Sequence, residues 1–224
     1  MKRTPSSQNP WCGWRLRPER NVVASSFRWA GLLLMLFVAV YGATNWISAQ
    51  RIDRLRLWFD WELAIPLVPW MVWVYLSLLV SFFLPMFALD EPRIHALCRR
   101  LAFATVVSGA CFMLFPAELG FTRLASVPGY DPAFRIVHAL DLPHNLAPSL
   151  HVSWSLIVLL SLRRISPGWL RFGFDAWLGA LLVSVLATHQ HHVLDVLGGM
   201  LVAFAAYAAV GPDGRWAGLQ RRVS

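Results

Sequence analysis

Apolar residues in this chain gather into six long continuous runs separated by short polar segments. Each run is about 15–22 residues long, close to the ~20 residues with which a helix crosses the hydrocarbon core of a bilayer. The pattern therefore predicts six membrane-spanning helices. Their expected bounds are 29–47, 68–89, 101–115, 147–162, 172–188 and 191–210.

Composition agrees with a membrane protein. Of the 224 residues, 57% are hydrophobic and only 14% are charged, whereas a soluble domain carries about 25% charged residues. An ordinary soluble enzyme and a disordered chain are thereby excluded. The predicted fold class is an all-α integral membrane bundle of six helices. We expect a disordered basic cytoplasmic tail at 1–28, the helical domain at 29–210, and a cytoplasmic C-terminal tail at 211–224.

The basic residues are distributed unevenly between the two sides of the predicted bundle. If the N-terminal tail is inside, 15 of the 20 basic residues lie inside and 5 outside. Cytoplasmic loops of membrane proteins carry such an excess of Lys and Arg. Both termini are therefore predicted to be cytoplasmic. The same placement, in the tail and in short loops, explains the net charge of +8 without a nucleic-acid partner.

Two segments on the outer side are more than simple turns. Residues 50–62 (QRIDRLRLWFDWE) mix charges with Leu, Trp and Phe, which predicts an amphipathic helix lying in the membrane interface. Residues 118–146 form a connection well above the usual length, and long loops are commonly functional. Within it, Asp131 and Pro132 are typical of a helix start.

Candidate chemistry begins at the fourth run, where Pro148, Ser149 and His151 fall within one helical turn. Free backbone N–H groups and the helix dipole make such a start a site for an anion such as phosphate. The hydroxyl of Ser149 adds a donor, and His151 adds a proton donor. The alternative is a simple Pro–Ser helix cap followed by an interfacial histidine.

A second polar cluster, THQHHVLD at 188–195, lies between the fifth and sixth runs. His191 and Asp195 are four residues apart, so on a helix they share a face. A carboxylate bonded to one ring nitrogen leaves the other free as a nucleophile or base. A polar helix cap and a zinc site of three histidines and one aspartate are the alternatives. The zinc site ranks second, because three such closely spaced histidines cannot all face one point on a regular helix.

The predicted topology brings the two clusters to the same membrane face. Each cluster begins a span that runs inward, although forty residues separate them, and six of the seven histidines lie on or beside this outer side. Ionisable groups at membrane depth are costly and are functional candidates by default. The two clusters together therefore predict an active site.

These residues resemble the motifs of the type 2 phosphatidic acid phosphatase superfamily. That family carries Lys-x6-Arg-Pro, Pro-Ser-Gly-His and Ser-Arg-x5-His-x3-Asp. Here residues 148–151 read Pro-Ser-Leu-His, and Ser184, His191 and Asp195 keep the third spacing with Val185 in place of Arg. The first motif survives only as Arg123. The Pro-Ser-Leu-His version, and the paired histidines before Asp195, look like a divergent bacterial branch of the family. They are also similar to inositol phosphorylceramide synthases.

The resemblance implies a role for each matching position. His191 would attack phosphorus, Asp195 would orient it, and His151 would protonate the leaving oxygen. Ser149 and Arg123 would hold the phosphoryl oxygens. Because the Lys and one Arg of the family are missing, His192 is a candidate for an additional phosphate ligand, with His189 as the alternative. A different substrate or a weak activity would also fit this loss. Neither a metal nor another cofactor is expected.

The expected function is hydrolysis of a phosphomonoester or diphosphate lipid through a phosphohistidine intermediate. The expected place is the periplasmic face of a bacterial inner membrane, with lipid phosphate and membrane as the partners and the oligomeric state open. One alternative is a headgroup phosphotransferase resembling inositol phosphorylceramide synthase. Another is a non-catalytic membrane protein whose motifs have decayed.

Overall fold

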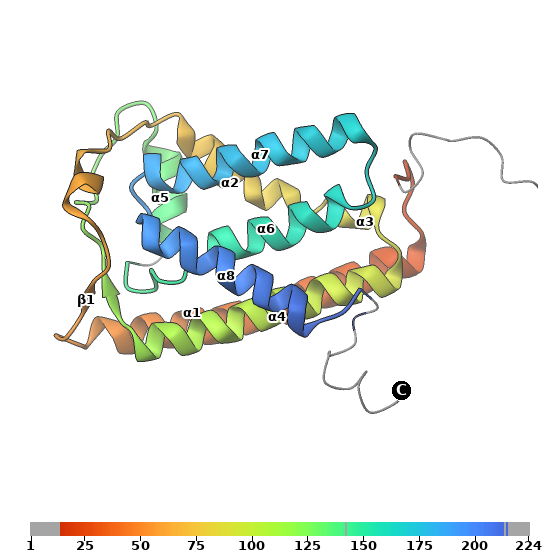
Figure 1. The fold of residues 1–224 in the computed structure, drawn as a ribbon, viewed down its shortest axis with the longest axis horizontal. Coiled ribbons are helices and arrows are strands. Elements are labelled where there is room, and N and C mark those ends of the chain that lie inside the picture. Colours follow the sequence, from red (N-terminus) through yellow and green to blue (C-terminus); the bar gives the residue numbers. More distant parts are fainter. Residues whose placement is uncertain (1–13, 142, 213, 215–224) are drawn as a thin grey trace, which may run out of the picture.

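The part of the chain that the computed structural model describes, residues 14–141, 143–212 and 214, is almost entirely helical (Figure 1). Its α-helices are α1 (Arg20–Ala49), α2 (Met71–Ser81), α3 (Pro85–Ala88), α4 (Glu91–Leu114), α5 (Asp131–Leu140), α6 (Leu150–Arg163), α7 (Gly168–Ala187) and α8 (Val193–Ala209). A 3-10 helix, η1 (Asp60–Ala64), and two short strands, β1 (Leu55–Arg56) and β2 (Ala117–Glu118), complete the fold.

Six of these helices correspond to the six apolar runs, and the predicted all-α membrane bundle is confirmed. By length and composition, α1, α4 and α7 are long and apolar enough to cross a membrane, and α2, α6 and α8 are shorter apolar helices. Large apolar side chains such as Leu34, Phe83 and Phe172 remain exposed on the outside of the bundle. Such a surface is expected where the surrounding solvent is hydrocarbon.

All three long helices begin earlier than the apolar pattern predicted, α7 by four residues and α1 and α4 by about ten. Helix α1 begins at Arg20 and so includes part of the predicted tail, whose residues 1–13 lie outside the described part of the chain. Helix α4 begins at Glu91, capped by the Asp90 carboxylate, which accepts from the Arg93 amide. Arg100 is therefore helical rather than part of a loop as predicted. It stays buried by donating to the carbonyl oxygens of Val210 and Gly211.

The run predicted as one span at 68–89 is broken into α2 and α3. Helix α2 ends at Ser81, and the short α3 begins at Pro85. Proline lacks the amide hydrogen of a continuing helix and its ring clashes with the preceding turn. The hydrophobic pattern of the run is continuous and does not predict this interruption.

The amphipathic helix predicted at 50–62 is not present. The segment is mostly irregular: the two-residue β1 pairs in parallel with β2, with Leu55 opposite Ala117, and only η1 at its end is helical. The physical reason is tertiary. The Glu62 carboxylate is fully buried and accepts from the backbone amides of Phe59 and Val193. Pairing and burial of this charge outweigh the local amphipathic pattern.

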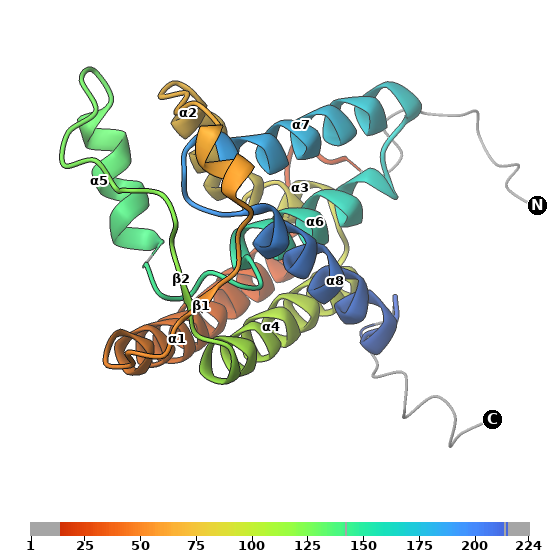
Figure 2. The ribbon, with the colours of Figure 1, turned by 60° about the vertical axis from the view of Figure 1, so that its left-hand side comes forward.

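Helix α6 occupies the middle of the bundle. It packs against α4, α7 and α8, while α1 packs along α4 and α2 along α7. The strand pair, η1 and α5 lie together at one end, where α6 and α8 begin (Figures 1 and 2). In Figure 2, α5 stands beside α2 at the edge of this end. The predicted outer segments therefore gather around the starts of the two motif-bearing helices.

The start of α8 lies very close to the start of α6. A Cβ added to Gly199 would come 2.5 Å from the carbonyl oxygen of Ser149 and 2.9 Å from Cβ of Val152. The Ser149 amide also donates to the carbonyl oxygen of Asp195 at 2.9 Å. Glycine at 199 is thus what lets the two motifs meet.

We predict that Gly199→Ala destabilises the protein by about 1–3 kcal/mol, because backbone atoms must shift to admit the methyl group. The matched control is Gly179→Ala on α7, where an added Cβ meets nothing within 4 Å. It should leave stability unchanged or slightly raised. Thermal unfolding in detergent measures both variants, and equal melting temperatures would contradict the close-packing interpretation.

Candidate functional site

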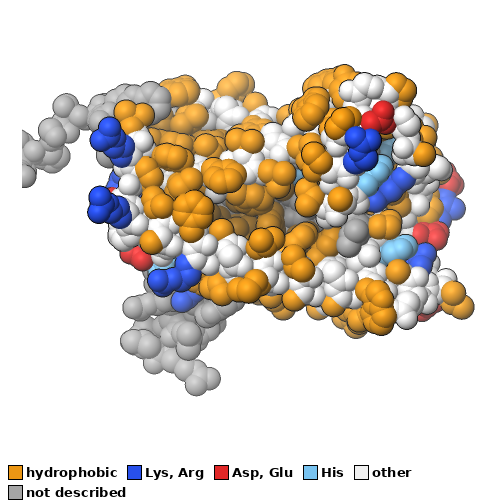
Figure 3. Space-filling view, turned by 180° about the vertical axis from the view of Figure 1, so that it is seen from behind, with side chains coloured by type: hydrophobic (Ala, Val, Ile, Leu, Met, Phe, Trp, Pro, Cys, Tyr) orange, Lys and Arg blue, Asp and Glu red, His pale blue; other side chains and the backbone are white. Residues whose placement is uncertain are grey.

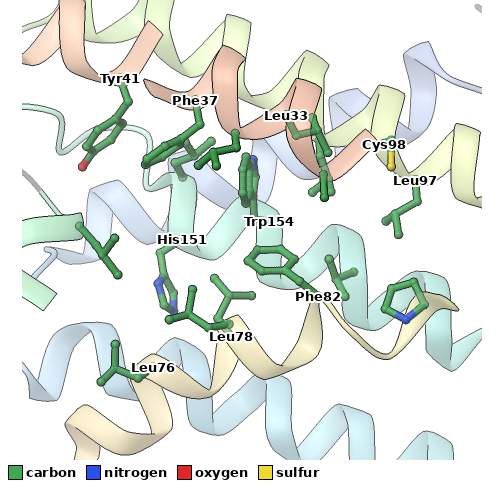
Figure 4. A pocket seen from close by; sticks show the side chains of 18 of the residues that line it. Leu33, Phe37, Tyr41, Leu76, Leu78, Phe82, Leu97, Cys98, His151 and Trp154 are labelled. Atoms are coloured by element: carbon green, nitrogen blue, oxygen red, sulfur yellow. The ribbon is translucent and has the colours of Figure 1, made fainter. Parts of the chain in front are cut away.

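The first motif begins α6 as a capped helix. Ser149 is the N-cap residue, fully buried, and its Oγ accepts from the Val152 amide at 3.3 Å. This is the cap geometry that the sequence offered as the simpler alternative. His151 follows in the first turn, with its ring aimed inward (Figure 4). The N-cap thus fixes where α6 begins and also orients the histidine in its first turn.

The second motif lies in the turn between α7 and α8. His189 adopts a left-handed backbone conformation, with φ of 58°, which reverses the chain. The amides of Gln190 and His191 both donate to the Val185 carbonyl oxygen at 3.1 Å. His191 therefore precedes α8. The four-residue spacing had predicted that His191 and Asp195 share a helical face, and this prediction is wrong. It still reaches Asp195, with 3.4 Å between Nδ1 and Oδ2.

The other nitrogen of His191 faces a second carboxylate, which sequence reasoning did not single out. Asp141, at the end of α5, places its Oδ2 3.4 Å from Nε2 of His191. The same carboxylate accepts from the hydroxyls of Tyr41 at 2.8 Å and Tyr75 at 2.6 Å. Two tyrosines and a histidine thus converge on one buried anion.

His151 joins this group through an aromatic contact. Its ring stacks on Tyr75 with centroids 3.9 Å apart, and its Nε2 is buried without a hydrogen-bond partner. Tyr75 therefore links His151 to Asp141, which in turn contacts His191. The two histidines that the sequence predicted as a pair surround one site.

Electrostatics couple Asp141 and His191. Burial favours the neutral carboxyl, but the interactions with His191 and the two tyrosine hydroxyls outweigh it and hold the pKa of Asp141 below its usual range. Burial likewise lowers the pKa of His191, yet Asp141 and Asp195 raise it to about 9. Near neutral pH the pair is therefore an imidazolium between carboxylates.

Arg123 lies beside this site. One of its terminal nitrogens donates to the backbone carbonyl oxygen of Asp141 at 2.8 Å. Its Nε is buried without a partner, so one donor on the guanidinium is unused. The residue is positioned to support the end of α5, and its charge acts on Tyr75.

His192 faces away from the pair. Its Nδ1 contacts Glu62 at 3.2 Å, its Nε2 accepts from the Gly120 amide at 3.0 Å, and its ring stacks between Trp58 and Phe121. Both ring nitrogens are therefore occupied. Within the described residues, no three His, Cys, Asp or Glu side chains are grouped to hold a metal ion. The zinc arrangement considered from the sequence therefore does not form.

The paired histidines open into a pocket of about 380 Å³ (Figure 4). His151, His191, Asp141 and the two tyrosines line one end, and Leu, Phe and Trp side chains line the remainder. A polar cluster that ends an apolar pocket suits an amphipathic ligand whose charged head and hydrocarbon tail need different surroundings.

Four residues of the site were missing from the sequence prediction: Tyr41, Tyr75, Asp141 and Glu62. The tyrosines sit within apolar runs, and the two acids sit within the outer segments. A weak signal was present, because each is a polar group at the outer end of a run or close to it. Their mutual contacts span 66 to 130 positions in sequence, so spacing could not reveal them.

We predict that the Asp141–His191 pair makes stability depend on pH. A raised histidine pKa contributes stability that is complete below about pH 6.5 and is lost as pH rises through 9. The lowered pKa of Asp141 contributes stability that is present above the ordinary pKa of a carboxyl group and is lost in acid. Wild type should lose up to about 3 kcal/mol between pH 7 and pH 9.5. Asp141→Asn should show a flatter profile in chemical unfolding, whereas the control Asp131→Asn should keep the wild-type slope.

Comparison with known proteins agrees with this site. The model of the PAP2 superfamily matches residues 50–209, which include both histidine motifs, α5 and the strand pair. No curated protein matches the chain significantly. The superfamily consists of phosphatases and phosphotransferases, so an enzyme acting on a phosphate ester in a membrane follows in general terms. The chain belongs to the PAP2 superfamily, that of the type 2 phosphatidic acid phosphatases.

Proposed function

We propose that this membrane protein hydrolyses a lipid phosphomonoester or diphosphate through a phosphohistidine intermediate on His191. The observation that carries the proposal is the placement of His191. It lies between two carboxylates at the polar end of an apolar pocket that His151 also lines. A nucleophile, its orienting group and a proton donor then face one space.

His191 attacks through Nε2, because Asp195 holds Nδ1. The raised pKa of His191 means that Nε2 carries a proton at rest. That proton must leave first, and the Asp141 carboxylate, 3.4 Å away, is the base in reach once the approaching phosphate anion raises its pKa. Once protonated, Asp141 is neutral and no longer repels an anionic phosphate.

The groups around Asp141 suggest where the phosphoryl oxygens bind. A carboxylate resembles a phosphoryl group in charge and in accepting several hydrogen bonds. When the Asp141 side chain moves aside, the hydroxyls of Tyr41 and Tyr75 become donors for the substrate. These donors, with Arg123 close by, compensate for the family's missing Lys and Arg.

Bond changes then follow in two steps. A bond forms from Nε2 of His191 to phosphorus as the bond to the leaving oxygen breaks, and His151 gives that oxygen a proton. Water next attacks the phosphohistidine and returns a proton to His151. Inorganic phosphate leaves, and His191 recovers its Nε2 proton from Asp141. Charge stabilisation by fixed donors is the main contribution in such transfers.

The remaining predicted residues support the site at different distances. Ser149 fixes the start of α6 and holds α8 through the Asp195 carbonyl oxygen. His192, with both nitrogens engaged, positions the loop around Glu62 instead of binding phosphate. Among the described residues, Arg93 at the start of α4, Arg163 at the end of α6 and Arg171 at the start of α7 lie at the opposite end of the bundle (Figure 1). By the positive-inside rule, we propose that the site faces the periplasm of a bacterial inner membrane.

We predict that His191→Ala abolishes phosphate release from lipid phosphates in the presence of EDTA, because no other imidazole replaces the nucleophile. The matched control is His95→Ala near the start of α4, which should keep wild-type activity. Phosphate release is measured by a colorimetric assay, and transfer is scored by adding a lipid alcohol and looking for a phosphodiester. Full activity of His191→Ala would exclude this nucleophile.

We further predict that Asp141→Asn moves the acidic limb of the kcat/KM profile to lower pH. Without the carboxylate, less charge stabilises the His191 imidazolium, so the free base forms in more acidic solution. Rates measured between pH 5 and pH 10 give the limb, with Asp131→Asn as the control. An unchanged limb would show that Asp141 does not set the protonation of the nucleophile.

A further inference from the structure

The pocket beside His191 continues far beyond the space that a phosphate needs. Along α1 its lining runs from Tyr41 to Ser26, fifteen residues apart, which is about 22 Å of helix. Polar groups concentrate at the outer end around His151 and His191. Beyond them the lining is almost wholly apolar, so the pocket is a long hydrocarbon-lined space with one polar end.

The pocket is accessible from the side of the bundle. It lies between α1 and α2, with α6 behind it (Figure 4). On the face seen in Figure 3, hydrophobic side chains dominate and the surface is hollowed in this region. A chain lying in the bilayer would meet an apolar surface on its way in, with no polar barrier to cross.

Three aromatic side chains narrow the pocket midway. Trp154 on α6 lies 5.8 Å from Phe37 and 5.4 Å from Phe82, measured between ring centroids. The two contacts come from opposite walls, α1 and the end of α2 (Figure 4). The three rings therefore bring side chains of α1, α6 and the end of α2 together at this depth of the pocket.

The inner end of the pocket is formed by α3 and α4. Pro85 and Met86 line it from α3, and Leu97 and Cys98 line it from α4. Cys98 is itself buried. A depth of about 22 Å exceeds half of the ~30 Å hydrocarbon thickness, so this end lies beyond the middle of the membrane.

We propose that the pocket is a binding site for a hydrocarbon chain of the lipid phosphate, and that its α4 end sets the longest chain accommodated. The inference rests on the proposed function, since the phosphate at His191 fixes the chain's starting point. Its occupant follows from continuity: the polar end fits the phosphate and the apolar end fits the attached chain. A chain too long for the pocket has to leave its end outside and loses contact.

The direct test uses alkyl phosphonates, which are not hydrolysed, with a diazirine at the chain terminus. After irradiation of the full-length protein in vesicles, mass spectrometry should place the hexadecyl label on Leu97 and Cys98. The octyl label should fall near Trp154 and Phe82. Labelling of outward-facing Trp169 and Phe172 by both probes would overturn the proposal. So would competition in which a phosphate-free lipid displaces the probes as well as a lipid phosphate does.

A paired substitution tests whether the end of the pocket measures the chain. Cys98→Phe fills that end, while Cys111→Phe makes the same change farther along α4, outside the pocket. Relative to octyl phosphate, hexadecyl phosphate should lose about tenfold in kcat/KM in Cys98→Phe, because the added ring overfills the space that the chain end occupies. The control should match wild type. Equal chain-length profiles in both folded variants would contradict the proposal.

The label also separates this inference from the proposed function. In His191→Ala the nucleophile is absent, but the pocket walls are intact. Chain-end labelling at Cys98 should therefore persist without any phosphate release. Hydrolysis by wild type without labelling inside the pocket would refute the chain site and leave the enzyme proposal standing.

Discussion

A buried imidazole held between two carboxylates is the interaction on which the site depends. His191 contacts Asp195 through one nitrogen and Asp141 through the other, and all three side chains are shielded from solvent. Charges in such surroundings are tolerated only when they are paired and hydrogen-bonded. The pairing therefore ties the end of α5 to the start of α8. The tyrosine hydroxyls add α1 and α2, so four elements distant in sequence converge on one ion.

The helical bundle was largely predictable because apolar run length is a local property. A run of about 20 apolar residues has few other stable outcomes in a membrane. The two predictions about helices that were wrong also have physical reasons. Pro85 broke a run that hydrophobicity alone left continuous. The segment at 50–62 carried an amphipathic pattern, but burial of Glu62 against the start of α8 decided its structure instead.

In the site, too, contacts set by local sequence were predictable and contacts between distant segments were not. The contact between His191 and Asp195 was predictable from a spacing of four residues, although the structure forms it just before a helix and not within one. The approach of His151 followed from helix direction. Asp141 could not be found in this way, because its partners Tyr41 and Tyr75 come from distant helices. Nor could the engagement of His192 by Glu62 and Gly120 be anticipated.

The long apolar pocket is related to the donors at its polar end, which are tyrosine hydroxyls in place of the family's Lys and Arg. A further Lys or Arg beside this pocket would add another charge to be desolvated next to the buried His191–Asp141 pair. Tyrosine hydroxyls are neutral and cheaper to bury, but they bind a phosphate dianion less strongly than full charges do. An enzyme with this donor set needs binding energy from elsewhere in its substrate. A chain held along about 22 Å of apolar wall can supply it through close packing against the pocket side chains. The loss of two charged residues from the family pattern is then compatible with activity on lipids, because chain contacts replace part of the headgroup binding.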